Sequence, residues 1–158
     1  MNNYKIELKW AIIFTIMSMT WMGIENATGL HDINIKKHAL LTNIIAVPAI
    51  LIYVFALMDK RKNDYNGSIQ YKQAFVSGLI LSIITAALSP INVLATYYLI
   101  SPHFFENMID YTVTQQMMTK EAAESYFSLR SYMLQSIIGA LFMGSVTGAI
   151  VGLFLKNK

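Results

Sequence analysis

The chain has 158 residues, of which 55% are hydrophobic and only 13% are charged. Soluble domains carry about 25% charged residues, so this composition excludes an ordinary soluble globular protein. A net charge of +3, without a basic patch interleaved with aromatics, argues against a nucleic-acid partner. The absence of cysteine excludes disulfides, thiol catalysis and zinc–thiolate sites.

The chain contains four long runs of mostly apolar residues. They cover residues 8–29, 38–58, 74–100 and 131–155. A bilayer core of about 30 Å needs about 20 helical residues, and lipid forces the backbone to satisfy its own hydrogen bonds. The sequence therefore predicts an all-α fold: an integral membrane four-helix bundle that forms one domain over residues 1–158, with the lipid bilayer as its surroundings.

Basic residues in the connections predict the orientation. Eight of them fall on one side of the predicted spans: Lys5, Lys9, Lys60, Arg61, Lys62, Lys72, Lys156 and Lys158. Four fall on the other side: Lys36, Lys37, Lys120 and Arg130. Cytoplasmic loops are enriched in lysine and arginine, so we expect both termini in the cytoplasm.

The outer connection, residues 101–130, is the longest segment outside the spans. Ser101 and Pro102 form a helix-start signal. An apolar stripe follows, made of Phe104, Phe105, Met108 and Ile109. These features predict a short amphipathic helix on the outer membrane surface between spans three and four. Thr119 is a second cap, from which we expect one continuous helix through span four.

Small residues recur every four positions in two spans. In the fourth span they are Ser136, Ala140, Gly144, Gly148 and Gly152, and in the third they are Gly78, Ser82 and Ala86. Such stripes mark helix–helix contacts in membranes. Two interpretations stay open: packing within one chain, or a homodimer seam along span four.

Two prolines predict kinks within the spans. Pro48 lies in the middle of span two and Pro90 in the outer half of span three. Each removes a backbone donor and frees the carbonyl four residues earlier. Broken helices form substrate sites in some transporters, whereas many membrane helices contain proline for packing alone.

Four polar residues on four different spans are predicted near the outer boundary: Glu25, Asn43, Asn92 and Gln135. Polar groups at this depth face one another or a wet cavity. They therefore form either interhelical hydrogen bonds or a small vestibule for a ligand or ion.

All three histidines also fall on the outer side, namely His31, His38 and His103. Histidines beside carboxylates bind metals or sense pH. Their spacing matches no metal motif, and no phosphate loop, dinucleotide fingerprint or nucleophile elbow occurs. No catalytic, cofactor or metal residue is assigned from sequence, and we expect no enzymatic activity.

Several stretches resemble a known family. They are Glu7-Leu8-Lys9-Trp10, Ile24-Glu25 followed by Gly29-Leu30-His31-Asp32, Asp59-Lys60-Arg61-Lys62, Asn66-Gly67 with Tyr71-Lys72-Gln73-Ala74-Phe75, and the acidic segment Thr119 to Tyr126. Over essentially the whole chain they resemble the bacterial membrane family called domain of unknown function 4199, typical of Bacteroidota. The resemblance implies an inner-membrane protein and brings no catalytic residue.

The leading functional hypothesis from sequence is a non-enzymatic structural or accessory membrane component. Its partner would be a second copy or another membrane protein, contacted through the small-residue faces. The alternatives are a small dimeric ion-coupled transporter with Glu25 as the coupling carboxylate, and an outward-facing pH or metal sensor.

Overall fold

The computed structural model describes residues 4–156, so Lys158, counted above among the inner-side basic residues, lies outside the described part. Throughout this part the regular elements are helical, which confirms the all-α prediction. In chain order they are α1 (Lys5–Ala27), η1 (Ile35–Lys37), α2 (His38–Leu41), η2 (Thr42–Ile45), α3 (Ala46–Asn63), α4 (Tyr71–Ala95), η3 (Thr96–Ile100), α5 (Phe104–Thr114), α6 (Lys120–Tyr126) and α7 (Leu129–Leu155).

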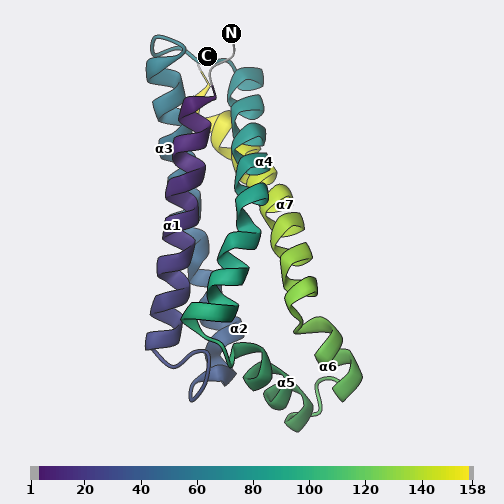
Figure 1. Ribbon diagram of the computed structural model, residues 1–158. Coiled ribbons are helices and arrows are strands. Elements are labelled where there is room, and N and C mark those ends of the chain that lie inside the picture. The colour runs from purple at the N-terminus through teal and green to yellow at the C-terminus, as the bar shows by residue number, and fades with distance from the viewer. Residues whose placement is uncertain (1–3, 157–158) are drawn as a thin grey trace.

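The long helices α1, α3, α4 and α7 run side by side (Figure 1). Both ends of the chain lie at the same end of this bundle, and the short helices α2, α5 and α6 lie at the opposite end (Figure 1). We call these the terminal end and the loop end. A core of Ala11, Tyr53, Ala56, Leu57, Leu81 and Val151 holds the long helices together.

Three helical segments are long and apolar enough to cross a membrane: Ile35–Asn63, Tyr71–Ile100 and Leu129–Leu155. They correspond to the predicted second, third and fourth spans. The predicted first span is helical over Lys5–Ala27, but it is not among the three. It carries Glu7 and Lys9 near one end and Glu25 near the other, and charged residues lower the mean hydropathy of a helix.

The second segment contains an irregular turn just before Pro48, where the sequence predicts a kink. Thr42–Ile45 forms the 3-10 turn η2 between α2 and α3. Proline at position 48 has no N–H to donate and its ring crowds the carbonyl of Ile44, so the chain tightens there.

Pro90 lies inside α4, where the freed carbonyl of Ala86 acquires a new donor. The Ser89 hydroxyl donates to this carbonyl at 2.9 Å, and it also contacts the Ser136 hydroxyl of α7 at 3.0 Å. A neighbouring hydroxyl thus replaces the lost backbone bond, as membrane helices require. Beyond Ala95 the helix widens into the π-helical turn η3.

The small-residue stripes of α4 and α7 face each other within the chain. A Cβ built on Gly78 would lie 2.9 Å from the Gly148 Cα, so the two backbones cross in direct contact. Ala74 lies similarly against Gly152, and Ser82 against Gly144. The glycines of the fourth-span stripe are therefore buried in this intrachain crossing.

The outer connection differs from the sequence prediction in two ways. Helix α5 begins at Phe104 rather than at Ser101, because Pro102 falls in a turn. The expected continuous helix from Thr119 is also wrong. Thr119 does cap α6, but the chain breaks after Tyr126, and the Ser128 hydroxyl then caps α7 by accepting from the Ser131 N–H at 3.3 Å.

The apolar face of α5 is packed against the protein. Phe104 and Phe105 are buried with Ala123 and Phe127, and Tyr132 of α7 packs against them. Helix α5 carries this apolar stripe, but these two rings face a hydrophobic cluster of the protein itself.

At the terminal end, a buried ion pair links three helices. Lys60 Nζ lies 3.0 Å from Glu7 Oε1 and 2.6 Å from the Asp64 carboxylate. The Ser77 hydroxyl of α4 donates to Glu7 at 2.7 Å. Glu7 is 2% exposed and Lys60 6% exposed, so these charges depend on each other for compensation.

Candidate functional site

The candidate site lies at the loop end and begins with the turn that ends α1. The Leu30 N–H donates to the Glu25 carbonyl at 2.9 Å, and the Gly29 N–H donates to the Asn26 carbonyl at 3.0 Å. These two bonds with Gly29 at φ +74° form a Schellman C-cap, which favours glycine at the left-handed position. The cap folds the chain back so that His31 lies against Glu25.

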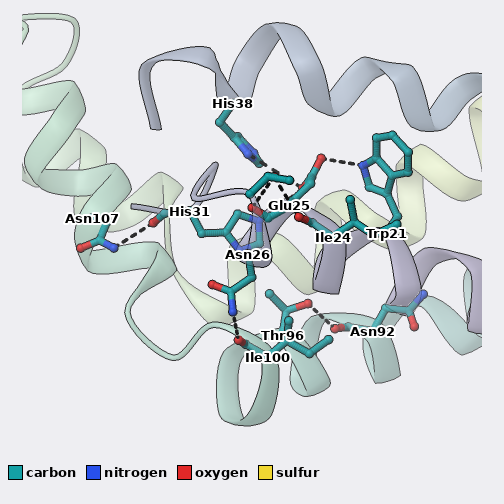
Figure 2. Close-up of polar contacts among 11 residues, drawn as sticks. Trp21, Ile24, Glu25, Asn26, His31, His38, Asn92, Thr96, Ile100 and Asn107 are labelled. Carbon is teal, nitrogen blue, oxygen red and sulfur yellow. Dashed lines mark hydrogen bonds and ion pairs between the residues drawn. The ribbon is translucent and has the colours of Figure 1, made fainter. Parts of the chain in front are cut away.

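Glu25 is completely buried in this turn, and its contacts come from several helices (Figure 2). The Trp21 indole N–H donates to Oε1 at 2.6 Å, and His31 Nε2 lies 3.3 Å from Oε2. The side chain of Thr42, at the start of η2, also interacts with the carboxylate. Among residues 4–156 no lysine or arginine forms an ion pair with Glu25.

His38, on the first turn of α2, completes a cluster of three metal-ligating side chains. Its Nδ1 lies 3.9 Å from Glu25 Oε2, beyond hydrogen-bond distance. Glu25, His31 and His38 can each present one ligand atom, and these atoms all lie within 4.8 Å of one another. We call these three residues the Glu–His–His cluster.

The surroundings hold the Glu–His–His cluster in place. The Phe104 ring packs against the His31 ring, with centroids 4.4 Å apart, and against the His38 ring at 5.0 Å. The Asn107 side chain of α5 donates to the His31 carbonyl at 2.8 Å, and the Asn26 side chain donates to the Ile100 carbonyl at 2.8 Å (Figure 2). Helix α5 thus closes the loop end over the cluster.

A cavity of about 550 Å³ lies beside the Glu–His–His cluster, between the long helices. Residues of α1, α3, α4 and α7 line it, and Thr42 and Phe104 belong both to its wall and to the cluster's surroundings. Helix α7 crosses α4 closely near the terminal end and diverges from it toward α6 (Figure 1). The cavity occupies the space that this divergence leaves open.

The wall is mostly apolar, with a few polar side chains: Ser18, Thr42, Thr85, Ser89, Asn92, Thr96, Gln135, Ser136 and Thr147. Two of them present buried atoms without a partner in the described part of the chain, Thr85 Oγ1 and Asn92 Oδ1.

The structure distributes the four predicted polar residues over three places. Glu25 lies in the Glu–His–His cluster, while Asn92 and Gln135 line the cavity. Gln135 donates to the Ser131 hydroxyl on its own helix at 2.9 Å. Asn43 lies apart from both, because it is exposed and donates to the Ala39 carbonyl at 2.7 Å.

The histidines separate in the same way. His31 and His38 join Glu25, but the His103 side chain is 78% exposed and pairs with Glu106 at 2.9 Å. The sequence predicts all three histidines on the outer side but does not predict that any of them contacts Glu25. The sequence signal for the contact between Glu25 and His31 is Gly29. A glycine at the end of a predicted helix marks a C-cap that reverses the chain, and His31 follows it two residues later.

The fold defines an all-helical membrane protein with three membrane-compatible helices, a cavity between its long helices and a buried carboxylate–histidine cluster. The chain belongs to the family described as protein of unknown function DUF4199, which matches residues 9–157. This confirms the resemblance found in the sequence. No curated protein and no solved structure matches the chain.

Proposed function

We propose that the protein is a non-enzymatic, multi-pass membrane protein that binds a small amphipathic molecule in the cavity between α1, α3, α4 and α7. The observation that carries the proposal is the wall of the cavity: a mostly apolar lining interrupted by polar side chains such as Asn92 and Gln135. Ligand pockets of about 300–1,000 Å³ combine these two properties.

The wall also indicates the chemistry of the ligand. An apolar body would pack against side chains such as Phe14, Met22 and Met143, and a hydroxyl or amide would form hydrogen bonds with polar wall residues such as Gln135 and Thr147. Among residues 4–156 no charged side chain lines the cavity, so a strongly ionic ligand is disfavoured. Both a carrier and a receptor would have to bind their ligand in this cavity, so the proposal applies to either class of protein.

We expect Gly139→Leu to fill the cavity and prevent ligand entry. Gly139 lines the cavity, and a Cβ built on it would meet nothing within 4 Å, so the larger side chain projects into open space. The measurement is photolabelling of the protein in lipid nanodiscs with an alkanol that carries a diazirine, followed by peptide mass spectrometry. We expect the wild type to be labelled on cavity residues and Gly139→Leu to lose most of this labelling.

Gly23→Leu is the matched control, since Gly23 also has open space around it but does not line the cavity. Its cavity labelling should equal that of the wild type. Labelling confined to exposed residues such as Ile138 and Phe142, or unchanged cavity labelling in Gly139→Leu, would contradict ligand binding here.

We further propose that α1 is a fourth membrane span and that the chain lies in a bacterial inner membrane with both termini in the cytoplasm. Helix α1 has 23 residues, about 35 Å at 1.5 Å per residue, which suffices to cross a bilayer core. It exposes Ile12, Ile13 and Ile16 at the surface of the bundle. The basic residues concentrated at the terminal end support the orientation.

This topology is directly testable because the chain contains no cysteine. A variant with one introduced cysteine therefore carries a single thiol at a known position. On spheroplasts, in which the inner membrane is intact, a membrane-impermeant maleimide should label Lys36→Cys and Gln115→Cys. It should label Tyr4→Cys and Lys62→Cys only after lysis. If α1 did not cross, Tyr4→Cys would be labelled together with Lys36→Cys.

The packing of α4 on α7 limits which surfaces an accessory component of the membrane could use to contact a partner. Gly144, Gly148 and Gly152 are buried against other helices of the same chain. A second copy or another membrane protein would therefore have to contact other faces, such as the exposed side of α7 with Ile138 and Phe142.

A further inference from the structure

We propose that Glu25, His31 and His38 form a binding site for a divalent transition-metal ion of the zinc class. The site is separate from the ligand cavity and does not depend on the function proposed for it. Three observations support it: the geometry of the ligand atoms, the charge balance of the buried carboxylate, and an unpartnered histidine nitrogen.

The geometry is close to that of a four-coordinate site. Zinc–nitrogen and zinc–oxygen bonds of about 2.0–2.1 Å place tetrahedral ligand atoms about 3.3–3.4 Å apart. His31 Nε2 and Glu25 Oε2 already lie 3.3 Å apart, and His38 Nδ1 lies 3.9 Å from the same oxygen. The three ligand atoms all lie within 4.8 Å of one another, so the His38 ring, which is 12% exposed at the edge of the site, has to move toward both partners to complete the tetrahedron.

The charge balance favours a cation. Glu25 is 0% exposed, and its carboxylate contacts within residues 4–156 are an indole N–H, a threonine side chain and two imidazoles. An ionised carboxylate without a counter-charge is expensive to bury. A divalent cation between the carboxylate and two neutral imidazoles would supply the missing positive charge.

Two imidazole nitrogens of the cluster, His31 Nδ1 and His38 Nδ1, have no hydrogen-bond partner in the described part of the chain, and His38 Nδ1 faces Glu25. Coordination would satisfy His38 Nδ1. The Trp21 N–H, 2.6 Å from Glu25 Oε1, orients the carboxylate from the side opposite the histidines, as outer-shell donors do in metal sites.

The donor set defines the class of ion. Two imidazoles and one carboxylate suit Zn²⁺, Cu²⁺, Ni²⁺ or Fe²⁺, whereas Mg²⁺ and Ca²⁺ prefer oxygen ligands alone. Three protein ligands leave one position of a tetrahedral ion open, the arrangement of zinc sites that bind an exogenous molecule.

The test uses the full chain, purified in detergent and freed of metal with a chelator. Equilibrium dialysis against Zn²⁺ with elemental analysis should give one tightly bound ion per chain. Co²⁺ titration should give the intense visible absorption of a four-coordinate site, and Mg²⁺ should not compete. Trp21→Phe should weaken Zn²⁺ binding about 10–100-fold, and His38→Ala should weaken it further.

The double variant His103→Ala/Glu106→Gln is the matched control. It also removes a histidine and a glutamate that pair with each other, but this pair is exposed at the start of α5. It should bind Zn²⁺ like the wild type. The proposal is overturned if wild-type Zn²⁺ binding does not exceed that of His38→Ala, or if Co²⁺ gives only the weak spectrum of a six-coordinate ion. The cobalt spectrum requires only the wild type, so it decides the matter even if the variants misfold.

Discussion

Gly148→Ala is expected to destabilise the protein by about 1–3 kcal/mol, the usual cost of overpacking. A Cβ at this position would lie 3.0 Å from the Gly78 Cα and 3.3 Å from its carbonyl carbon. Both atoms belong to backbone, so the two helices have to separate to make room. This separation would loosen the crossing that holds α7 on α4.

Gly139→Ala, on the same helix, is the control for this experiment. It meets nothing within 4 Å, and alanine is favoured over glycine in a helix by about 0.5–1 kcal/mol. The two substitutions should therefore change stability in opposite directions. SDS-induced unfolding in mixed micelles measures both, and equal midpoints for the two variants would contradict direct backbone contact at the crossing.

Lys60→Met is expected to cost about 3–5 kcal/mol, because it leaves Glu7 as an uncompensated buried charge. The Ser77 hydroxyl, which donates to Glu7 at 2.7 Å, remains after the substitution but carries no formal charge. The double variant Glu7→Gln/Lys60→Met removes both charges and should recover most of the lost stability. The same SDS titration measures the single and double variants.

The matched control is Lys9→Met, the same substitution in an ion pair whose lysine is open to solvent and whose carboxylate is 15% exposed. Lys9 pairs with Asp59, and its side chain is 53% exposed. The Trp10 N–H, 2.8 Å from Asp59, remains after the substitution. Exposed pairs contribute about 0–1 kcal/mol, so Lys9→Met should unfold close to the wild type. A Lys60→Met protein no less stable than Lys9→Met would show that the buried pair does not stabilise the fold.

Features set by neighbouring residues could be predicted from the sequence. Helical segments follow from apolar length, the Thr119 cap from its hydroxyl, and the disturbance at Pro48 from its missing N–H. The prediction of a continuous helix from Thr119 was wrong, because no glycine or proline marks the break before Ser128. The break accompanies the burial of Phe127 in the α5–α6 cluster, a contact between distant segments.

By itself, the sequence determined the helical character of the protein, its apolar segments and the small-residue faces of α4 and α7. Only the tertiary structure decided that these faces meet within one chain, that Glu7 pairs with Lys60 53 positions away, and that Glu25 meets two histidines. The physical reason is that backbone hydrogen bonds in a helix form between neighbours in sequence. The rotation and crossing of membrane helices depend on packing and on a few polar contacts, because apolar residues on every side of a helix leave no single hydrophobic face to orient it.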